Sequence, residues 1–286
     1  MANCHPISLD VNDSKALDEQ AAKVDVLISL IPYTFHKLVI ESAIRNKKHV
    51  VTTSYVSPAM QELNEQAKEA GITVMNEIGL DPGIDHLYAV KTIDEVHEAG
   101  GKITSFLSYC GGLPAPEASD NPLGYKFSWS SRGVLLALRN SAKYWKDGKV
   151  EDVAGPELMG HAKPYHIYPG CKYMVYLKLH HMLINHPADN FVAYPNRDST
   201  PYKERYNIPE ADNLVRGTLR YGGFPEFVKV LVDIGFLSDE PTEYLDAQKV
   251  KSPPTWAETT AKVVGATSGS QNDIEWAISS KTSFPR

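Results

Sequence analysis

The chain has 286 residues, of which 42% are hydrophobic and 22% charged, a composition ordinary for a globular protein long enough to form two domains. Its formal net charge of −6 argues against a nucleic-acid or acidic-membrane partner, since such partners select a basic face. No apolar run approaches the ~18 residues of a membrane span, and the three widely spaced cysteines fit neither a disulfide framework nor a zinc motif, so we expect a reduced, cytoplasmic protein.

Strand and helix patterns alternate through the first hundred residues. Apolar or alternating stretches predict strands at residues 6–11, 24–31, 49–53 and 72–75. Helical patterns predict helices at residues 16–22, 34–48, 57–70 and from 84 onward, the second and third capped by Thr34 and Ser57. The strand at 24–31 is apolar almost throughout, which is typical of a parallel strand covered on both faces. This alternation indicates an α/β fold with a doubly wound, Rossmann-like parallel sheet.

A tight turn, Asp81-Pro82-Gly83, follows the last of these strands. Proline fixes its own φ angle and glycine relieves the backbone, so the Asp81 carboxylate is held on a stiff turn. Ligands of open parallel sheets bind at the carboxyl ends of the strands, where this aspartate lies. Asp81 is therefore a candidate site residue, and the alternative is a turn residue that caps the next helix.

The pattern changes after Gly100 and Gly101. Residues 102–110 read as a longer, alternating strand, and strands, turns and short helices then mix. Such a mixture is typical of an α+β domain rather than of further βαβ units. We therefore predict a Rossmann-like domain at residues 1–100 and an α+β domain at residues 101–286.

The fingerprint G-x-G-x-x-G, which opens a dinucleotide-binding fold, does not occur in the sequence. The sheet therefore reads as one that lacks its first βαβ unit. Two alternatives are open at this point. Either the protein does not bind a dinucleotide, or roughly 45 residues, about one βαβ unit with its turns, precede residue 1.

Seven long strings carry a family resemblance. They are ISLIPYTFH (28–36), VVTTSYVSPAM (50–60), NEIGLDPGIDHL (76–87), SYCGGLPAPE (108–117), NPLGYKFSWSSRGVL (121–135), YPNRDSTPYKERY (194–206) and VRGTLRYGGF (215–224). Together they closely resemble the NADP-dependent, L-glutamate-forming saccharopine dehydrogenases of fungi, also called saccharopine reductases. The resemblance implies that α-aminoadipate semialdehyde and glutamate condense and that NADPH reduces the imine to saccharopine, in the α-aminoadipate route to lysine. It also implies that residues 1–100 are a partial NADP-binding domain and that residues 101–286 bind the substrate.

The resemblance assigns roles to individual residues. Imine formation also needs proton transfers to the carbinolamine, and we predict Tyr55, Asp81 and Cys110 as the catalytic polar groups around the reacting carbon. Cofactor contacts are implied for Asp10, Val11, Ile31, Thr53, Ser54, Leu80, Asp81, Pro82 and Ser130. Substrate contacts are implied for Ser54, Tyr55, Asp81, Ser130, Arg197, Thr218, Leu219 and Arg220. Because saccharopine is a polycarboxylate and the planar guanidinium pairs with two carboxylate oxygens at once, Arg197 and Arg220 are the expected clamps.

Several alternatives stay open. A truncated paralogue or gene-model fragment would act at most as a binding module, and distant relatives that act on carboxynorspermidine or homospermidine suggest another substrate, against which the two arginines argue. For Tyr55, Asp81 and Cys110 the alternatives are a core tyrosine, a turn cap and a buried structural thiol. No histidine pair has the H-x-x-x-H spacing of a zinc site, so we expect no metal. The expected partners are the small-molecule substrates, with no nucleic acid and no membrane, and a homodimer is possible.

The chain departs from the family at both ends and once inside. It has no Gly-rich turn and no ribose-phosphate reader, and it stops at Arg286, before the family's further helical region. We therefore expect the chain alone to bind NADPH weakly or not at all, because pyrophosphate affinity comes from amides at a helix N-terminus. Residues 171–190 interrupt a run that passes in the family almost directly from YPG to FVAYPNRDS.

We predict that residues 171–190 are a translated intron. Their removal joins Gly170 to Phe191 and restores the family run, and the segment crowds apolar side chains without a helical or strand period. A lineage-specific surface helix is the alternative, since long insertions in exposed loops cost little. Mass spectrometry of tryptic peptides from the native protein decides between them. A peptide covering residues 179–197 contradicts the intron, and one that joins Gly170 to Phe191 confirms it.

Overall fold

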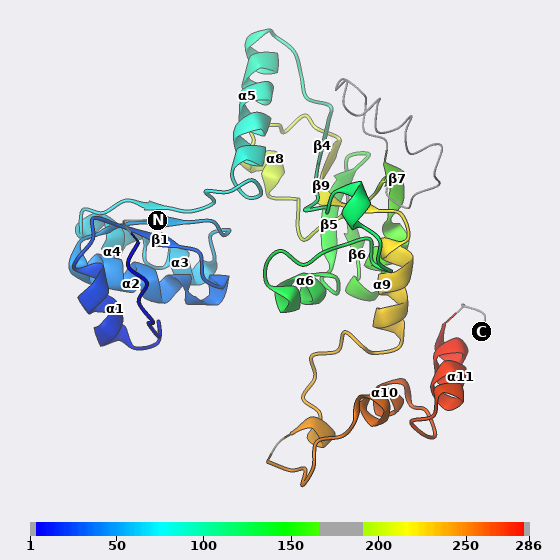
Figure 1. The fold of residues 1–286 in the computed structure, drawn as a ribbon. Coiled ribbons are helices and arrows are strands. Elements are labelled where there is room, and N and C mark those ends of the chain that lie inside the picture. Colours follow the sequence, from blue (N-terminus) through cyan, green and yellow to red (C-terminus); the bar gives the residue numbers. More distant parts are fainter. Residues whose placement is uncertain (1–3, 166–190, 247, 283–286) are drawn as a thin grey trace. The chain divides into compact units, whose positions relative to one another are not determined.

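In the computed structural model, residues 4–165, 191–246 and 248–282 are described. The chain forms two compact units that divide between Gly101 and Lys102 (Figure 1). The insertion predicted at residues 171–190 lies outside the described residues. None of the helices in the described part has the length and apolar character that a membrane crossing requires.

The first unit alternates helices with short strands, as its sequence predicts. Its helices are α1 (Ser14–Ala21), α2 (His36–Asn46), α3 (Pro58–Gln61), α4 (Asn64–Glu69) and α5 (Ile84–Glu98), with a 3₁₀ turn at Tyr33–Phe35. Its strands are β1 (Val26–Ser29), β2 (His49–Thr52) and β3 (Val74–Met75). Ser57 caps α3, because its side chain accepts a hydrogen bond from the Met60 amide and Pro58 occupies the first turn.

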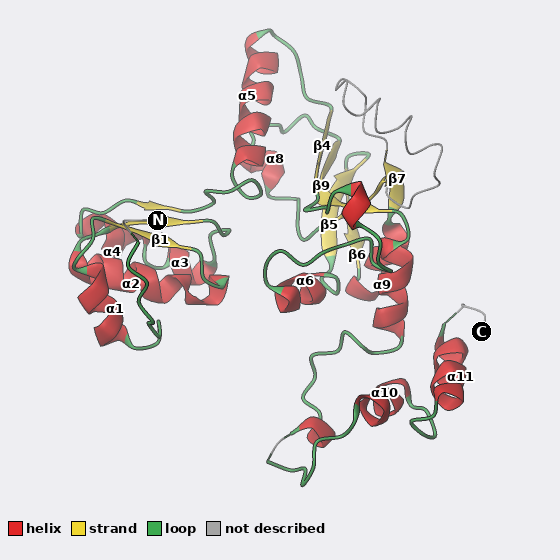
Figure 2. Ribbon diagram, in the orientation of Figure 1, coloured by secondary structure: helices red, strands yellow, loops and turns green. Residues whose placement is uncertain are grey.

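The strands of this unit form a parallel sheet in the order β1-β2-β3, which confirms the predicted fold class. The register pairs Val26 with His49 and Val50 with Val74. Helices α1, α2 and α3 lie on one side of the sheet (Figure 2). The core on that side is built from α2, β2 and the region of α3, through Val39, Ile40, Ala43, Val50, Met60 and Leu63.

Three sequence predictions about this unit are wrong. Strand β1 is not covered on both faces, because Val26 and Ile28, which share one face, are 47% and 69% exposed. Residues 6–11 form no strand, since a strand needs a hydrogen-bonded neighbour and none of the described residues pairs with them. Helix α2 begins after the 3₁₀ turn with Phe35 at its N-cap, so Thr34 does not cap it.

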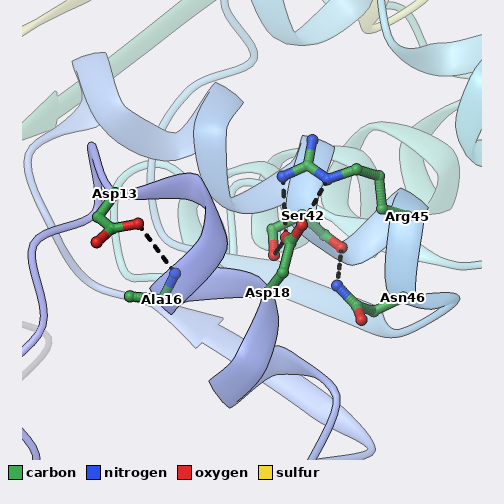
Figure 3. A network of polar contacts seen from close by, with 6 residues as sticks. All are labelled: Asp13, Ala16, Asp18, Ser42, Arg45 and Asn46. Atoms are coloured by element: carbon green, nitrogen blue, oxygen red, sulfur yellow. Dashed lines mark hydrogen bonds and ion pairs between the residues drawn. The ribbon is translucent and has the colours of Figure 1, made fainter.

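A polar network joins α1 to α2 (Figure 3). Asp18 of α1 accepts hydrogen bonds from Ser42 Oγ at 2.5 Å and from Arg45 Nε and Nη2 at 2.9 Å. The Asn46 side chain donates to the Ser42 carbonyl at 2.9 Å. The hydrogen bonds from Arg45 lower the pKa of the Asp18 carboxyl, so the folded state favours its ionised form.

We expect Asp18→Asn to destabilise the first unit by about 1–3 kcal/mol near pH 7, because it removes charge-assisted hydrogen bonds to Ser42 and Arg45. The pKa of Asp18 is lower in the folded than in the unfolded state. Its stabilisation is therefore present above the unfolded pKa of about 4 and is lost as the pH falls through the folded pKa. Urea denaturation across this pH range measures the effect.

The control for this prediction is Asp13→Asn. It removes a charge from the same region, but asparagine caps a helix as well as the Asp13 side chain that now accepts from the Ala16 amide (Figure 3). The assigned role of Asp18 is contradicted if both variants lose the same free energy of unfolding. It is also contradicted if the difference in free energy of unfolding between them does not become smaller towards acidic pH.

The second unit mixes strands and helices. Its strands are β4 (Ser105–Cys110), β5 (Ala142–Lys146), β6 (Lys149–Val153), β7 (Lys163–Tyr165), β8 (Phe191–Pro195) and β9 (Asn213–Tyr221). Its helices are α6 (Ser131–Ala137), α8 (Tyr202–Arg205), α9 (Phe224–Asp233), α10 (Trp256–Val264) and α11 (Gln271–Lys281). Its 3₁₀ segments are Pro116–Ala118, Gly155–His161 and Glu243–Leu245.

The described strands of the second unit form a mixed sheet in the order β6-β5-β9-β8-β7, and β4 also pairs with β9. The β4–β9 pair is parallel and the other pairs are antiparallel. Its largest apolar core includes residues of α6, of the Gly155–His161 segment and of α9, namely Val134, Leu158, Met159, Phe224 and Val228. Strand β9, which pairs with β4, β5 and β8, carries the predicted substrate residues 218–220.

Candidate functional site

Two loops at the carboxyl ends of β2 and β3 carry predicted site residues of the first unit. Tyr55 follows β2 and Asp81 follows β3, and the Tyr55 hydroxyl donates a hydrogen bond of 2.5 Å to Asp81 Oδ1. Asp81 does not cap α5, because the N-cap residue of that helix is Gly83. The structure therefore joins two of the three predicted catalytic side chains by one hydrogen bond.

Glu77 holds these two loops together. Its amide donates to the Ser54 carbonyl at 3.1 Å, and its Oε1 accepts from the Val56 amide at 3.3 Å. Its Oε2 lies 3.4 Å from Nε2 of His86 on α5. Both the Glu77 and the His86 side chains are nearly buried, at 11% and 12% exposed. The loop after β2 is thus anchored to the loop after β3 and to the helix that follows it.

Ser54 also contacts a buried histidine. His36, the first residue of α2, is fully buried, and its Nε2 lies 2.9 Å from Ser54 Oγ. Its Nδ1 lies 2.8 Å from Oγ of Ser29, the last residue of β1. Burial lowers the pKa of His36, which favours the neutral ring. The ends of β1 and β2 are therefore linked through one imidazole.

The other predicted cofactor residues near these strand ends differ in exposure. Ile31 follows β1 and is partly buried, whereas Thr53 follows β2 and is exposed. Leu80 is 73% exposed after β3, and Pro82 behind it is buried. The carboxyl edge of the sheet therefore offers an apolar surface, formed by Ile31 and Leu80, next to the exposed side chain of Thr53 with its hydroxyl group.

Asp10 and Val11 lie in the turn before α1. Asp10 Oδ1 accepts hydrogen bonds from the backbone and side-chain amides of Asn12, both at 2.9 Å. These hydrogen bonds, the backbone one first, lower the pKa of the exposed Asp10 carboxyl. An exposed carboxylate of this kind can accept hydrogen bonds from sugar hydroxyls.

In the second unit, the guanidinium of Arg220 is enclosed by aromatic rings. The residue is 9% exposed, and its Cζ lies 4.7 Å from the centroid of the Tyr125 ring and 5.2 Å from that of Phe224. Nη1 donates to the Leu219 carbonyl at 2.9 Å. Among the described residues, the buried Nε of Arg220 has no hydrogen-bond partner. A buried cation with an unused donor favours an anionic ligand.

Thr218 shares one face of β9 with Arg220, because the two positions are two residues apart. In the sheet register, Thr218 pairs with Cys110 at the end of β4 and with Tyr194 of β8. Thr218 also hydrogen-bonds the Tyr194 side chain, whose pKa is raised by burial. Cys110 is exposed, which excludes the alternative of a buried structural thiol. The predicted substrate residue Leu219 lies between Thr218 and Arg220 and faces the other way.

Arg197 is placed differently from Arg220. It is exposed and has a φ angle of 55° in the loop after β8. Its neighbour Asn196 donates to the carbonyl of Arg216, which precedes Arg220 by four strand positions or roughly 13 Å. The structure therefore does not bring the backbones of the two expected clamps side by side.

Ser130 is exposed and forms the N-cap of α6, where its Oγ accepts from the Gly133 amide at 3.1 Å. Its predicted contact with cofactor and substrate stays a prediction. Within the described residues, no group of three or more histidine, cysteine or acidic side chains is placed to hold a metal ion.

Residues 79–279 match the family model described as the saccharopine dehydrogenase C-terminal domain. The chain belongs to the saccharopine dehydrogenase family. Residues 1–75 match a second model, described as the saccharopine dehydrogenase NADP binding domain.

Individual relatives agree with this family. The chain is 69% identical to the saccharopine dehydrogenase (NADP+, L-glutamate-forming) of Pyricularia oryzae, over 98% of this chain and 57% of that protein. For the Saccharomyces cerevisiae protein of the same name, the identity is 62% over 97% and 57%. This chain is also 42% identical to the mitochondrial alpha-aminoadipic semialdehyde synthase of Bos taurus, over 95% of this chain and 27% of that protein. An apo saccharopine dehydrogenase (L-Glu forming) from S. cerevisiae superposes with a TM-score of 0.77 at 61% identity, covering 98% of this chain and 58% of that one.

The chain thus spans about 57% of the length of these fungal saccharopine dehydrogenases.

Sequence analysis missed residues that support the predicted site, namely His36, Glu77, His86, Tyr125 and Tyr194. All of them stand within the family strings. The available signal was a polar side chain at the end of an apolar run, as for His36 after ISLIP, but burial and partners depend on contacts that the local pattern does not contain.

In this member of the saccharopine dehydrogenase family, Gly83 closes the loop that carries Asp81. A Cβ at this position would lie 2.1 Å from the Gly79 carbonyl oxygen and 2.6 Å from the Gly79 amide nitrogen. We expect Gly83→Ala to destabilise the first unit by about 1–3 kcal/mol or more, because backbone atoms cannot move aside as a side chain can. Gly112→Ala, in the second unit, checks that a methyl group in open space leaves stability unchanged, since no atom lies within 4 Å of a Cβ there. A first-unit urea midpoint in Gly83→Ala equal to that of the unaltered chain would show that the loop tolerates the methyl group.

Proposed function

We propose that the residues of this chain serve a saccharopine reductase. α-Aminoadipate semialdehyde and L-glutamate condense to an imine with loss of water, and NADPH with a proton reduces the imine to saccharopine, giving NADP+. The observation that carries the proposal is the buried Arg220 guanidinium with its unused Nε donor, which suits a polycarboxylate. Identities of 58–69% to fungal proteins of this name support it and favour an enzyme over a binding module.

NADP is the proposed cofactor. The match of residues 1–75 to an NADP binding domain supports this choice, and parallel sheets bind nicotinamide at the carboxyl ends of their strands. The apolar surface and hydroxyl group at that edge, from Ile31, Leu80 and Thr53, fit a flat ring with a polar amide. Asp10 and Val11 would hold the adenosine side. When bound, NADPH supplies the hydride, and the protein positions the carbon that receives it.

Residues of the second unit would hold at least one substrate carboxylate. Arg220 and Thr218 share one face of β9 and offer a guanidinium and a hydroxyl group to the same anion. Arg197 and Ser130 are exposed and can hold other polar groups of the substrate. Three anionic groups on one substrate explain why more than one cationic side chain is needed.

Proton transfer is assigned to the pair of Tyr55 and Asp81. Imine formation requires a proton for the departing hydroxyl group of the carbinolamine and a base for the amine. The Tyr55 hydroxyl already donates to Asp81, so the pair can hold a proton and pass it to a neighbouring oxygen. Cys110, exposed at the end of β4, is the third proposed polar group.

The test uses the chain in a full-length setting. Because the chain spans 57% of the P. oryzae relative, the remaining segments of that protein are joined to it to give an extended chain. We expect the extended chain to reduce NADP+ when saccharopine is present. The absorbance of the NADPH that forms measures the reaction. An extended chain that folds but shows no turnover, while the P. oryzae parent is active, overturns the proposal. A cytoplasmic location and a homodimer stay predictions, to be checked by cell fractionation and light scattering.

A further inference from the structure

We propose that His36 is a positioning residue that keeps the hydroxyl proton of Ser54 available to an anionic ligand. The geometry is a line of three polar side chains, Ser29, His36 and Ser54, at the carboxyl ends of β1 and β2, of which Ser29 and His36 are buried. Only the identity of the ligand, a carboxylate of the substrate, rests on the proposed function. The arrangement of protons can be derived from the described residues alone.

The imidazole of His36 has one donor and one acceptor nitrogen when it is neutral. The ring is fully buried, which disfavours the charged form. Its nitrogens lie 2.8 Å from Ser29 Oγ and 2.9 Å from Ser54 Oγ. One serine must therefore donate its proton to the ring, and the other must accept a proton from it.

Ser29 decides which of the two donates. It is 4% exposed, and its only side-chain hydrogen-bond partner among the described residues is His36 Nδ1. If the ring donated from Nδ1, the hydroxyl proton of Ser29 would be buried without an acceptor, which costs about 1–3 kcal/mol. The satisfied arrangement has Ser29 donating to Nδ1, so that the ring proton resides on Nε2.

The proton on Nε2 then determines what Ser54 presents. Its Oγ accepts from His36, so its own proton points to another partner. Ser54 is only partly buried and lies in the loop that also carries Tyr55. A carboxylate can only accept hydrogen bonds, and in this tautomer Ser54 meets it as a donor. In the opposite tautomer the Ser54 proton would be used by the ring, and lone pairs would face the anion.

The direct test is ¹⁵N NMR of the histidine rings in the 286-residue chain. The His36 signals are assigned with His36→Gln. We expect Nε2 protonated and Nδ1 bare in the neutral ring, which burial favours by lowering the pKa of His36. Ser29→Ala should lower the fraction of this tautomer. Ser42→Ala, which removes a buried hydroxyl from the same helix without touching His36, should not. A protonated Nδ1 in the unaltered chain, or no change with Ser29→Ala, overturns the proposal.

A kinetic test in the extended chain separates this inference from the proposed function. Ser29→Ala should raise the KM for saccharopine about tenfold and change kcat less. His36→Gln, whose amide nitrogen replaces Nε2, should retain more affinity than His36→Asn, which replaces only Nδ1. Turnover with an unchanged KM in Ser29→Ala overturns the positioning role and leaves the proposed function intact. The predicted tautomer without any turnover in the unaltered extended chain overturns the proposed function and leaves the proton arrangement intact.

Discussion

Arg220→Lys should raise the KM for saccharopine about 10- to 100-fold in the extended chain, because a charge-assisted pair with a carboxylate is worth ~1.5–3 kcal/mol and lysine cannot reproduce the fork. The guanidinium is buried against Tyr125 and Phe224, so water has little access to replace the lost contact. Steady-state kinetics of saccharopine oxidation measure the effect, and kcat should change less than KM.

Arg197→Lys is the matched comparison for this prediction. The family resemblance assigns Arg197 a substrate contact as well, so its KM should also rise by about 10- to 100-fold. A raised KM in Arg220→Lys alone would assign the clamp to β9 and remove Arg197 from the site. Unchanged KM values in both variants contradict the carboxylate clamp altogether. Urea denaturation of each variant checks that a raised KM does not come from a loss of folding stability, for example through the aromatic contacts of Arg220.

Asp81→Asn should lower kcat by about 10²- to 10⁴-fold, the usual range for loss of a general acid or base, and should change KM less. The reason is the hydrogen bond of 2.5 Å that Tyr55 donates to Asp81 Oδ1. Asparagine can still accept this bond but cannot take up a proton. Tyr55→Phe removes the other member of the pair and should lower kcat in the same direction.

The double variant shows whether the two residues act as one unit. If they share one proton, Asp81→Asn with Tyr55→Phe should lose little more activity than the more damaging single variant. Tyr88→Phe is the control, because Tyr88 lies on α5 with 69% of its surface exposed. A kcat in Asp81→Asn that matches the unaltered chain removes Asp81 from proton transfer.

Local patterns were sufficient to predict most elements of the first unit. The alternation of apolar strands with capped helices predicted β1, β2, β3 and their order along the chain, and the Ser57-Pro58 signal predicted the start of α3. These features depend on periodicity and on hydrogen bonds within a few residues. The same reasoning failed for residues 6–11 and for the coverage of β1, because strand pairing and face coverage depend on neighbours that the local pattern does not specify.

The candidate site shows the same division. Sequence strings identified the family, and Tyr55, Asp81 and Arg220 within them were predicted as candidate site residues. The hydrogen bond between Tyr55 and Asp81 required two loops to be brought together by parallel pairing of β2 with β3. The enclosure of Arg220 required rings from a distant loop and from α9.

Local patterns and family strings were thus enough to give the order of the elements, the family and the chemical types of side chain available to the site. Which of these side chains are buried, which meet, and which of the two arginines is enclosed depends on the three-dimensional packing, because hydrogen-bond partners and desolvation are set by contacts between residues far apart in the chain. His36 shows this most directly, since a histidine after an apolar run becomes the link between Ser29 and Ser54 only when α2 packs against the sheet.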